Sequence, residues 1–174
     1  VNELPYPGLP VRASVTAGGV LVPASASTDE NGTVRFLWTP GPGPLNQLTA
    51  TLEGASPSTA LVVPALGKPY FAAWALVNAA SHQAGISPGC LATLYGVNFT
   101  GGATARAEFP WPDRLAEARV SLDGKPVPLL FASDQQINFL VPASLRPGTA
   151  ELVVSTPLGL SPAAPITLEA VSPG

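Results

Sequence analysis

Few residues in this chain could carry chemistry. The 174 residues include a single histidine, His82, and a single cysteine, Cys90. A nucleophile–base–acid set would need a serine and a carboxylate that converge on His82, and no recognisable partner motif accompanies it. One cysteine excludes an intramolecular disulfide, and one histidine excludes the usual Cys/His zinc sets. We therefore expect no enzymatic activity, with His82 on the surface or in a turn and Cys90 packed at the start of a strand.

Oxygen donors gather at one point in the first half of the chain. The segment Asp29-Glu-Asn-Gly32 resembles part of a calcium loop. A complete loop needs further donors and a bidentate glutamate several residues on, and none follows. The pair Asn31-Gly32 is instead a strong signal for a hairpin turn. We expect a turn at this point, and neither a metal nor another cofactor in the chain.

Trp111 is the aromatic residue with the clearest potential for binding. It lies in Phe109-Pro-Trp-Pro112, where two prolines disfavour regular strand pairing, and Asp113 and Arg114 follow. An exposed tryptophan in such a loop could stack on a sugar or on a partner surface. The alternative is a loop aromatic that folds back onto its own domain. We take Phe109, Trp111, Asp113 and Arg114 as the candidate partner-binding residues.

The composition is that of a folded protein with little charge. Apolar residues make up 46% of the chain, enough for a packed core, whereas only 11% of residues are charged. The net charge of −3 gives no electrostatic basis for binding nucleic acid or an anionic membrane. The longest uncharged apolar run, residues 70–77, is far shorter than the roughly 20 residues of a membrane helix. The chain contains no methionine, so we expect a processed product or a fragment of a longer protein.

The first half alternates apolar and polar residues in short runs, a pattern typical of half-buried strands. The alternating runs are residues 11–17, 33–39 and 47–53, and residues 20–22 and 59–63 are interpreted as further short strands. Trp38 alternates in register with Val34 and Phe36, so we expect its ring in the core. Residues 64–69, bounded by Pro64 and Pro69, lack periodicity and are interpreted as a short, stiff linker.

The second half also consists of short segments between turn signals, without a long amphipathic helix. We expect a strand buried on both faces at residues 90–95, and further strands at residues 120–122, 129–132, 136–141, 150–154 and 166–171. Asp123-Gly124 predicts a hairpin, and residues 71–80 stay open between a strand and a short helix. Trp74 lies in that apolar run, and we expect it to pack at the junction of the two halves. Both halves are predicted to be β-sandwiches.

The first half resembles a known bacterial domain family. The segments are Thr28-Asp-Glu-Asn-Gly32, Val34-Arg-Phe-Leu-Trp-Thr39 and Asn46-Gln-Leu-Thr-Ala50. Their order is similar to that of the group 1 bacterial immunoglobulin-like domain of invasin- and intimin-type proteins. The match covers most of residues 1–66. Only ten residues, ending with the segment Pro5–Pro10, precede the first run, so the resemblance implies a domain that lacks its usual first strand.

The second half contains a series of segments in a characteristic order: Val77-Asn-Ala-Ala-Ser81, Ser87–Gly96, Val120–Gly124, Gln135–Pro142 and Val171–Gly174. With them it resembles the Solibacter-type C-terminal domain found in secreted proteins of soil Acidobacteria, and more widely the IPT/TIG immunoglobulin-like folds. This resemblance implies a fold and an extracytoplasmic location. It implies neither a catalytic mechanism nor ligand residues.

Together these features predict an all-β chain of two tandem immunoglobulin-like β-sandwiches, residues 1–66 and 70–174. We expect a non-catalytic module of a secreted or cell-surface bacterial protein, acting as a spacer, in adhesion or in presentation beside neighbouring domains. Expected partners are a protein or a polysaccharide at the cell surface, and neither nucleic acid nor an inserted membrane. The alternative is a carbohydrate-binding accessory module of a larger extracellular polysaccharide-active enzyme. That alternative requires a solvent-facing row of aromatic side chains, and the sequence offers one good candidate, Trp111.

Overall fold

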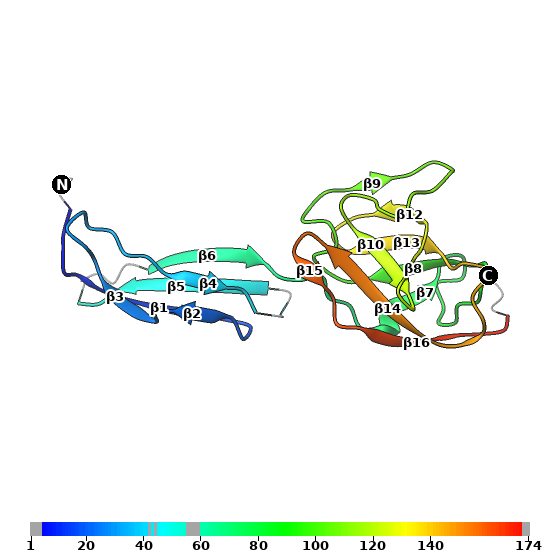
Figure 1. Ribbon diagram of the computed structural model, residues 1–174, viewed down its shortest axis with the longest axis horizontal. Coiled ribbons are helices and arrows are strands. Elements are labelled where there is room, and N and C mark those ends of the chain that lie inside the picture. Colours follow the sequence, from blue (N-terminus) through cyan, green and yellow to red (C-terminus); the bar gives the residue numbers. More distant parts are fainter. Residues whose placement is uncertain (1–4, 42, 44, 55–59, 172–174) are drawn as a thin grey trace. The chain divides into compact units, whose positions relative to one another are not determined.

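The computed structural model describes residues 5–41, 43, 45–54 and 60–171. The chain forms two compact units, the first ending at Gly67 and the second beginning at Lys68. The described residues form β-strands and a single 3₁₀ turn, so the all-β prediction is confirmed (Figure 1). No helix among these residues has the length and apolar character required to cross a membrane.

The first unit contains a four-stranded antiparallel sheet in the order β3-β1-β5-β6 and a two-stranded pair, β2 with β4. The strands are β1 (Pro10–Val15), β2 (Val20–Val22), β3 (Ser25–Ser27), β4 (Leu37–Thr39), β5 (Leu45–Leu52) and β6 (Ala60–Leu66). The predicted alternation holds in the two central strands, where Val11, Ala13 and Leu48 are buried. Thr59, at the start of one predicted strand, lies outside the described residues.

The strand predicted at residues 33–39 is only partly correct. Pairing begins at Leu37, opposite Val22, and the residues before it are not in a strand. The predicted face is nevertheless present, because Val34, Phe36 and Trp38 are each half-buried whereas Arg35 is exposed. Trp38 is therefore a partly covered residue rather than a fully buried core residue.

Asp29 closes the turn that precedes this segment. Its Oδ1 accepts hydrogen bonds from the backbone N–H groups of Asn31 and Thr33, each at 2.9 Å. The N–H of Gly32 donates to the carbonyl of Asp29 at 2.9 Å, and Gly32 has a φ of +71°. The turn is as predicted, although no strand follows it directly. The carboxylate is used in local turn bonds, which accounts for its position beside Asn31 without a metal.

The predicted linker at residues 64–69 is wrong for its first three residues. Strand β6 continues through Pro64 to Leu66, with Pro64 opposite Gln47 and Leu66 opposite Leu45. Proline is tolerated in a strand at the end of a sheet, where its missing N–H need not reach a neighbour. The absence of alternation misled the interpretation, because β6 is exposed on both faces over most of its length.

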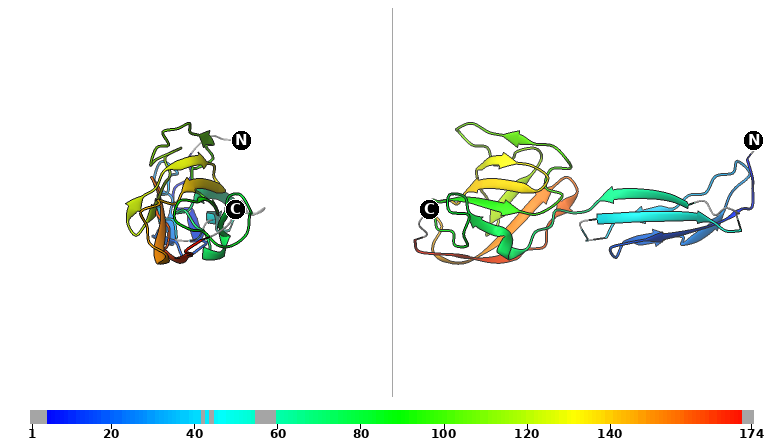
Figure 2. Two further views of the ribbon diagram at one scale, coloured as in Figure 1. Left: turned by 90° about the vertical axis from the view of Figure 1, so that its right-hand side faces the viewer. Right: turned by 180° about the vertical axis from the view of Figure 1, so that it is seen from behind.

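The second unit is a two-layer β-sandwich (Figures 1 and 2). One sheet has the order β7-β8-β13-β12-β9, and the other contains β10, β11, β14, β15 and β16, with β14 pairing β10, β15 and β16. The bounds are β7 (Leu76–Asn78), β8 (Leu91–Tyr95), β9 (Ala105–Arg106), β10 (Arg119–Leu122), β11 (Lys125–Pro126), β12 (Leu129–Ala132), β13 (Gln136–Leu140), β14 (Gly148–Thr156), β15 (Gly159–Leu160) and β16 (Ala164–Leu168).

The strand register aligns the core-facing residues of the first of these sheets in one row. Ala105, Ala132, Ile137, Leu94 and Leu76 are successive cross-strand partners, and the central three are fully buried. Residues of β10, β14 and β16 cover them from the opposite sheet. Because side chains alternate along a strand, the other face of this sheet is turned away from the core.

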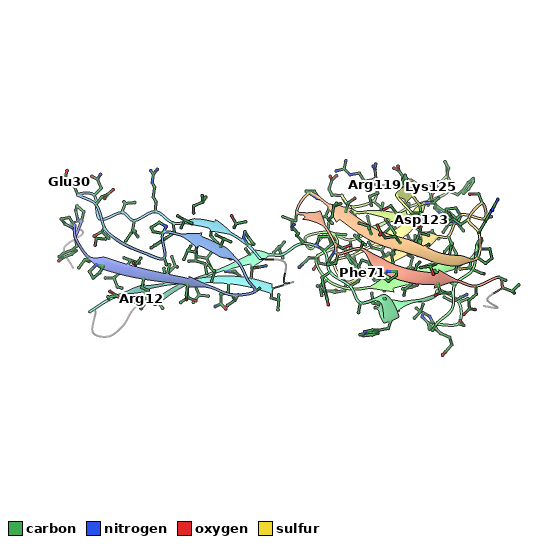
Figure 3. All side chains as sticks on the ribbon, turned by 60° about the horizontal axis from the view of Figure 1, so that its bottom comes forward. Arg12, Glu30, Phe71, Arg119, Asp123 and Lys125 are labelled. Carbon is green, nitrogen blue, oxygen red and sulfur yellow. The ribbon has the colours of Figure 1, made fainter. Side chains whose placement is uncertain are left out.

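Most predicted strands of the second unit are confirmed, and so is the hairpin at Asp123-Gly124. These two residues have φ values of +50° and +74° and join β10 to β11, beside Lys125 (Figure 3). Residues 71–80 contain both candidate structures, a 3₁₀ turn at Ala73–Ala75 followed by β7. Strand β8 was expected to be buried throughout, but Tyr95 at its end is 40% exposed. The last segment of the second resemblance, Val171–Gly174, includes residues 172–174, which lie outside the described residues.

Candidate functional site

The outward-turned face of sheet β7-β8-β13-β12-β9 carries a mixed row of side chains, in which the central Thr93 is covered by its neighbours and only 1% exposed. Val77, Thr93, Asn138, Phe131 and Arg106 are successive cross-strand partners from β7 to β9. This row lies one residue out of phase with the buried row of the same strands, so it belongs to the opposite face. We call this surface the outer face.

An unpaired segment at residues 71–75 places an exposed tryptophan beside the outer face. Tyr70 is bridged to Val97, and pairing resumes only at Leu76, opposite Leu94. Residues 71–75 therefore bulge out past Tyr95 and Gly96 and contain the 3₁₀ turn. Within the bulge Phe71 and Ala75 are buried, with Phe71 inside the second unit in Figure 3, whereas Trp74 is 84% exposed.

Three exposed aromatic side chains surround a groove at this point. Tyr70 is 44% exposed, Trp74 84% and Tyr95 40%, and all three line a groove of about 520 Å³. Its remaining lining is the side chains or backbone of Phe71, Ala72, Ala75, Val77, Gly96 and Val97. Among the described residues, no charged one lines it. The groove is therefore suited to an uncharged ligand with faces that can stack on aromatic rings.

Gly96 allows the backbone to come close enough to form the floor of this groove. A Cβ at this position would lie 2.4 Å from Cζ of the fully buried Phe99 ring, 2.5 Å from the carbonyl oxygen of Tyr70 and 3.0 Å from the Cβ of Phe71. The first two distances are too short for a side chain to be accommodated unless the Phe99 ring and the Tyr70 backbone move. Gly96 thus keeps Tyr70 and Phe71 next to the end of β8.

A second hollow of about 280 Å³ lies further along the outer face. It is lined by Arg106, Leu130, Phe131, Gln136 and Asn138. The register of β12 against β13 shifts between Leu129 and Phe131, which is a β-bulge. Leu130 and Phe131 are both half-buried beside this hollow, whereas Leu129 and Ala132 are fully buried in the core. The bulge thus adds an apolar residue to the outer face.

Two amide side chains form the polar part of this hollow. Gln136 Nε2 donates a hydrogen bond to Asn138 Oδ1 at 2.8 Å, and both residues are half-buried. Arg106 is exposed at the edge of the sheet. The hollow therefore combines an apolar floor with hydrogen-bond donors and acceptors.

In the loop predicted to bind a partner, the exposed ring is that of Phe109 and not that of Trp111. Phe109 is 82% exposed, whereas Trp111 is half-buried and meets Phe109 edge to face, with ring centroids 5.8 Å apart. Asp113 and Arg114 are exposed but paired, Asp113 with Arg119 at 3.5 Å and Arg114 with Glu117. The loop offers one free aromatic ring, and its two predicted charges are used within the loop and its following strand.

His82 and Cys90 occupy the simple positions expected of them. His82 is exposed in a turn with a φ of +56°, and its backbone N–H donates a hydrogen bond to the backbone carbonyl of Asn78. Cys90 is partly buried against the core just before β8, and its Sγ accepts a hydrogen bond from the N–H of Ser87. Both predictions are confirmed.

The inference that no recognisable partner motif accompanies His82 needs one correction, because Gly85-Ile-Ser-Pro-Gly89 has the Gly-x-Ser-x-Gly spacing of a hydrolase nucleophile motif. Its structural setting is different. A nucleophile elbow lies between a strand and a helix, with the serine hydroxyl exposed. Here the run lies in the connection from β7 to β8, and Ser87 is only 8% exposed. The match in spacing therefore carries no catalytic meaning.

The aromatic groove is the feature that the sequence reasoning missed. Trp74 was expected to be packed because it stands in an apolar run, and Tyr95 because its strand was interpreted as buried on both faces. One signal was available for Tyr95. Tyr95 directly follows the core residue Leu94, so period-2 alternation places the two side chains on opposite faces of the sheet. The position of Trp74 depends on the bulge at residues 71–75, for which the sequence carries no comparable pattern.

No protein-family model and no curated protein matches the chain. Among solved structures it is similar to the D0–D1 domain of intimin, with 10% identity, a TM-score of 0.32 and coverage of 95% of this chain and 85% of that chain. It is similar to invasin, a bacterial integrin-binding protein, with 20% identity, a TM-score of 0.28 and coverage of 95% and 33%. It is also similar to SGBP-B of the Bacteroides ovatus mixed-linkage glucan utilization locus, in complex with a mixed-linkage heptasaccharide, with 14% identity, a TM-score of 0.34 and coverage of 90% and 37%. The chain thus spans about a third of the invasin and SGBP-B chains.

Proposed function

We propose that the chain is a non-catalytic binding module of an extracellular or cell-surface bacterial protein, and that its second unit binds carbohydrate at the aromatic groove. The observation that carries this proposal is the exposure of Trp74, 84%, beside Tyr70 and Tyr95 in a groove that no charged residue of the described chain lines. The proposal takes up the carbohydrate-binding alternative, which requires a solvent-facing row of aromatic side chains.

The chemistry of the groove favours a sugar over other neutral ligands. A pyranose presents C–H groups on its faces and hydroxyls around its edge. Aromatic faces carry negative charge density and attract C–H groups, and a tyrosine also has a hydroxyl that can donate and accept hydrogen bonds. Two tyrosines and a tryptophan therefore supply both kinds of contact. A groove for an acyl chain would be lined mainly by aliphatic side chains.

The domain assignment is part of the same proposal. We assign residues 1–66 and 70–174 to two immunoglobulin-like domains, the first lacking its usual first strand. The two-sheet antiparallel arrangement of the second unit supports this assignment, as does the resemblance of both halves to domains of secreted and surface bacterial proteins. In such a protein the two domains would act as spacers that present the groove to a polysaccharide.

The loop from Phe109 to Arg114 supports a second candidate function, the binding of a protein partner. The specific observation is that Phe109 is 82% exposed at the tip of an edge-to-face pair with Trp111. A rigid, exposed aromatic ring is a common anchor in protein interfaces. The paired charges of Asp113 and Arg114 would form a polar rim around it.

The two candidates are separated by matched variants of exposed aromatic residues. The full chain is run in native gels containing mixed-linkage β-glucan, cellulose derivatives, xylan or mannan. We expect retardation by at least one polysaccharide, loss of about tenfold in affinity for Trp74→Ala, and no change for Phe109→Ala. Absence of binding to every polysaccharide, or wild-type retardation of Trp74→Ala, would overturn the carbohydrate proposal.

A further inference from the structure

We propose that the ligand is an oligosaccharide chain that lies across the outer face, from the aromatic groove at Trp74 to the hollow at Arg106. In this arrangement Gln136 and Asn138 recognise hydroxyl groups of the sugar units furthest from Trp74. The inference rests on the proposed carbohydrate binding and adds its extent, its direction and its polar contacts.

The first argument is that the groove and the hollow meet at one cross-strand pair. Tyr95 lines the aromatic groove and Gln136 lines the hollow, and the two are direct partners in the pairing of β8 with β13. Directly opposed residues on one face have Cβ atoms about 4.5–5.5 Å apart. The two binding regions are therefore neighbours on one continuous surface.

The second argument concerns length. From β8 the sheet continues through β13 and β12 to β9, which carries Arg106. With neighbouring strands roughly 4.8 Å apart, Arg106 lies about 15 Å across the sheet from the strand of Tyr95. A single sugar ring cannot contact both ends of this surface. A chain of several linked pyranoses can, because each linkage carries it further across the strands.

The third argument is the change in chemistry along the surface. Stacking rings at Tyr70, Trp74 and Tyr95 bind any pyranose face and carry little information about which sugar is present. The side-chain amides of Gln136 and Asn138 provide directional contacts. Their mutual hydrogen bond leaves three groups for a ligand: the second Nε2–H and the Oε1 of Gln136, and the Nδ2 of Asn138. A pair of neighbouring sugar hydroxyls requires this combination of donor and acceptor.

A competing direction starts from the other side of Trp74. There the ring also lines a hollow of about 330 Å³ with Ile86, Thr167 and the exposed Glu169. That hollow involves β16 of the opposite sheet, so a chain entering it would leave the outer face. Glu169 is therefore a suitable control, since its neutralisation should leave a ligand on the outer face unaffected.

The test is calorimetric titration of the full chain with sugars of two lengths: cellobiose and cellohexaose, xylobiose and xylohexaose, mannobiose and mannohexaose. For the series that binds, we expect the hexasaccharide to bind at least about tenfold more tightly than the disaccharide, consistent with one or two added hydrogen bonds. We expect Gln136→Leu and Asn138→Val to reduce hexasaccharide affinity about tenfold without changing disaccharide affinity. Glu169→Gln should change neither, and Trp74→Ala should weaken both.

The failure of this inference differs from the failure of the proposed function. If the two lengths bind equally, or if the amide variants weaken both lengths alike or neither, the chain does not cross the outer face. A loss of hexasaccharide affinity in Glu169→Gln would assign the other direction. If no wild-type complex forms with any of these sugars, or if Trp74→Ala binds normally, the carbohydrate proposal itself is wrong. If Gln136→Leu and Asn138→Val melt at a lower temperature than the wild type, Arg106→Ala is used in their place, because Arg106 is exposed at the same end of the surface.

Discussion

Tyr70 and Val97 exchange two backbone hydrogen bonds, from Tyr70 N–H to the Val97 carbonyl at 3.1 Å and from Val97 N–H to the Tyr70 carbonyl at 2.9 Å. This bridge precedes the bulge at residues 71–75 and fixes one end of it. It depends on the approach of the two backbones at Gly96, where a Cβ would lie 2.5 Å from the Tyr70 carbonyl oxygen. The exposure of Trp74 is thus linked to a glycine at the end of the neighbouring strand.

Gly96→Ala is expected to destabilise the second unit and to damage the aromatic groove together. The added methyl group must displace the buried Phe99 ring and the Tyr70 backbone, and such overpacking typically costs about 1–3 kcal/mol. Thermal unfolding followed by circular dichroism should show a lower melting temperature. Native gels should show weaker polysaccharide retardation of the protein that remains folded. An unchanged melting temperature would show that the backbones at Gly96 are free to separate.

The sequence predicted best those strands that bury one face against the core and expose the other. In β13 the residues Ile137 and Phe139 are fully buried, and in β10 the residues Val120 and Leu122 are fully buried. Where alternation coincides with the core, period 2 in the sequence identifies the strand. Strand β6 was truncated in the prediction because its side chains contact no opposing layer over most of its length.

The candidate site could be predicted much less well, for a related reason. Tyr70, Trp74 and Tyr95 come from a bridge, a bulge and a strand end, and only the bulge determines that Trp74 is exposed. An apolar run such as residues 70–77 is equally consistent with a buried segment. The hollow at Gln136 and Asn138 depends on a register shift in β12, and no residue type in that strand marks the shift.

Trp111 is expected to contribute to stability, whereas Phe109 should not. Trp111 is half-buried, so its replacement by alanine should cost about 2 kcal/mol, less than the roughly 3–5 kcal/mol for a fully buried tryptophan. Phe109 is 82% exposed, and Phe109→Ala should stay within about 0.5 kcal/mol of the wild type. Urea unfolding of the two variants measures the difference. Equal free energies of unfolding would show that the loop is independent of its domain.

Trp38→Phe is expected to be tolerated in the first unit. The Nε1–H of Trp38 is buried and has no hydrogen-bond partner among the described residues. A buried unpaired donor costs about 1–3 kcal/mol, and phenylalanine removes it while keeping most of the apolar contact. Its free energy of unfolding should therefore lie within about 1 kcal/mol of the wild type. Trp38→Ala should cost about 2 kcal/mol or more, and a phenylalanine variant as unstable as the alanine variant contradicts the argument.

The first unit is expected to open more readily than the second. Its buried apolar side chains among the described residues are Val11, Ala13 and Leu48, each still 5–9% exposed, whereas a continuous buried cluster fills the second unit. Local opening free energies follow the amount of buried apolar contact. Native-state hydrogen exchange of the intact chain should give amides of β5 an opening free energy at least about 2 kcal/mol below those of β13. Equal protection in the two strands would show that the chain opens as one cooperative structure.

Pro64 is expected to protect the open edge of strand β6. The N–H and carbonyl of Gln47, its cross-strand partner, both bond to Thr16, so they point away from β6. Gln47 and Pro64 are therefore a non-hydrogen-bonded pair, and the ring nitrogen of Pro64 faces the open edge of the sheet. Any other residue would add a donor there, in a strand where Leu61 is 64% and Val62 48% exposed. Such an apolar edge can pair with another chain, and proline is one of the residues that prevents it.

Pro64→Val should therefore leave the stability of the first unit nearly unchanged but promote self-association, because no hydrogen bond inside the sheet is lost and one edge donor is gained. Sedimentation velocity at increasing protein concentration should show larger species for Pro64→Val than for the wild type. Adding Val62→Lys to the same variant should restore the monomer, since a charge on the edge opposes pairing. If Pro64→Val stays monomeric at every concentration, the edge is protected by something other than proline. If it unfolds more readily instead, the orientation assigned to the Pro64 nitrogen is wrong.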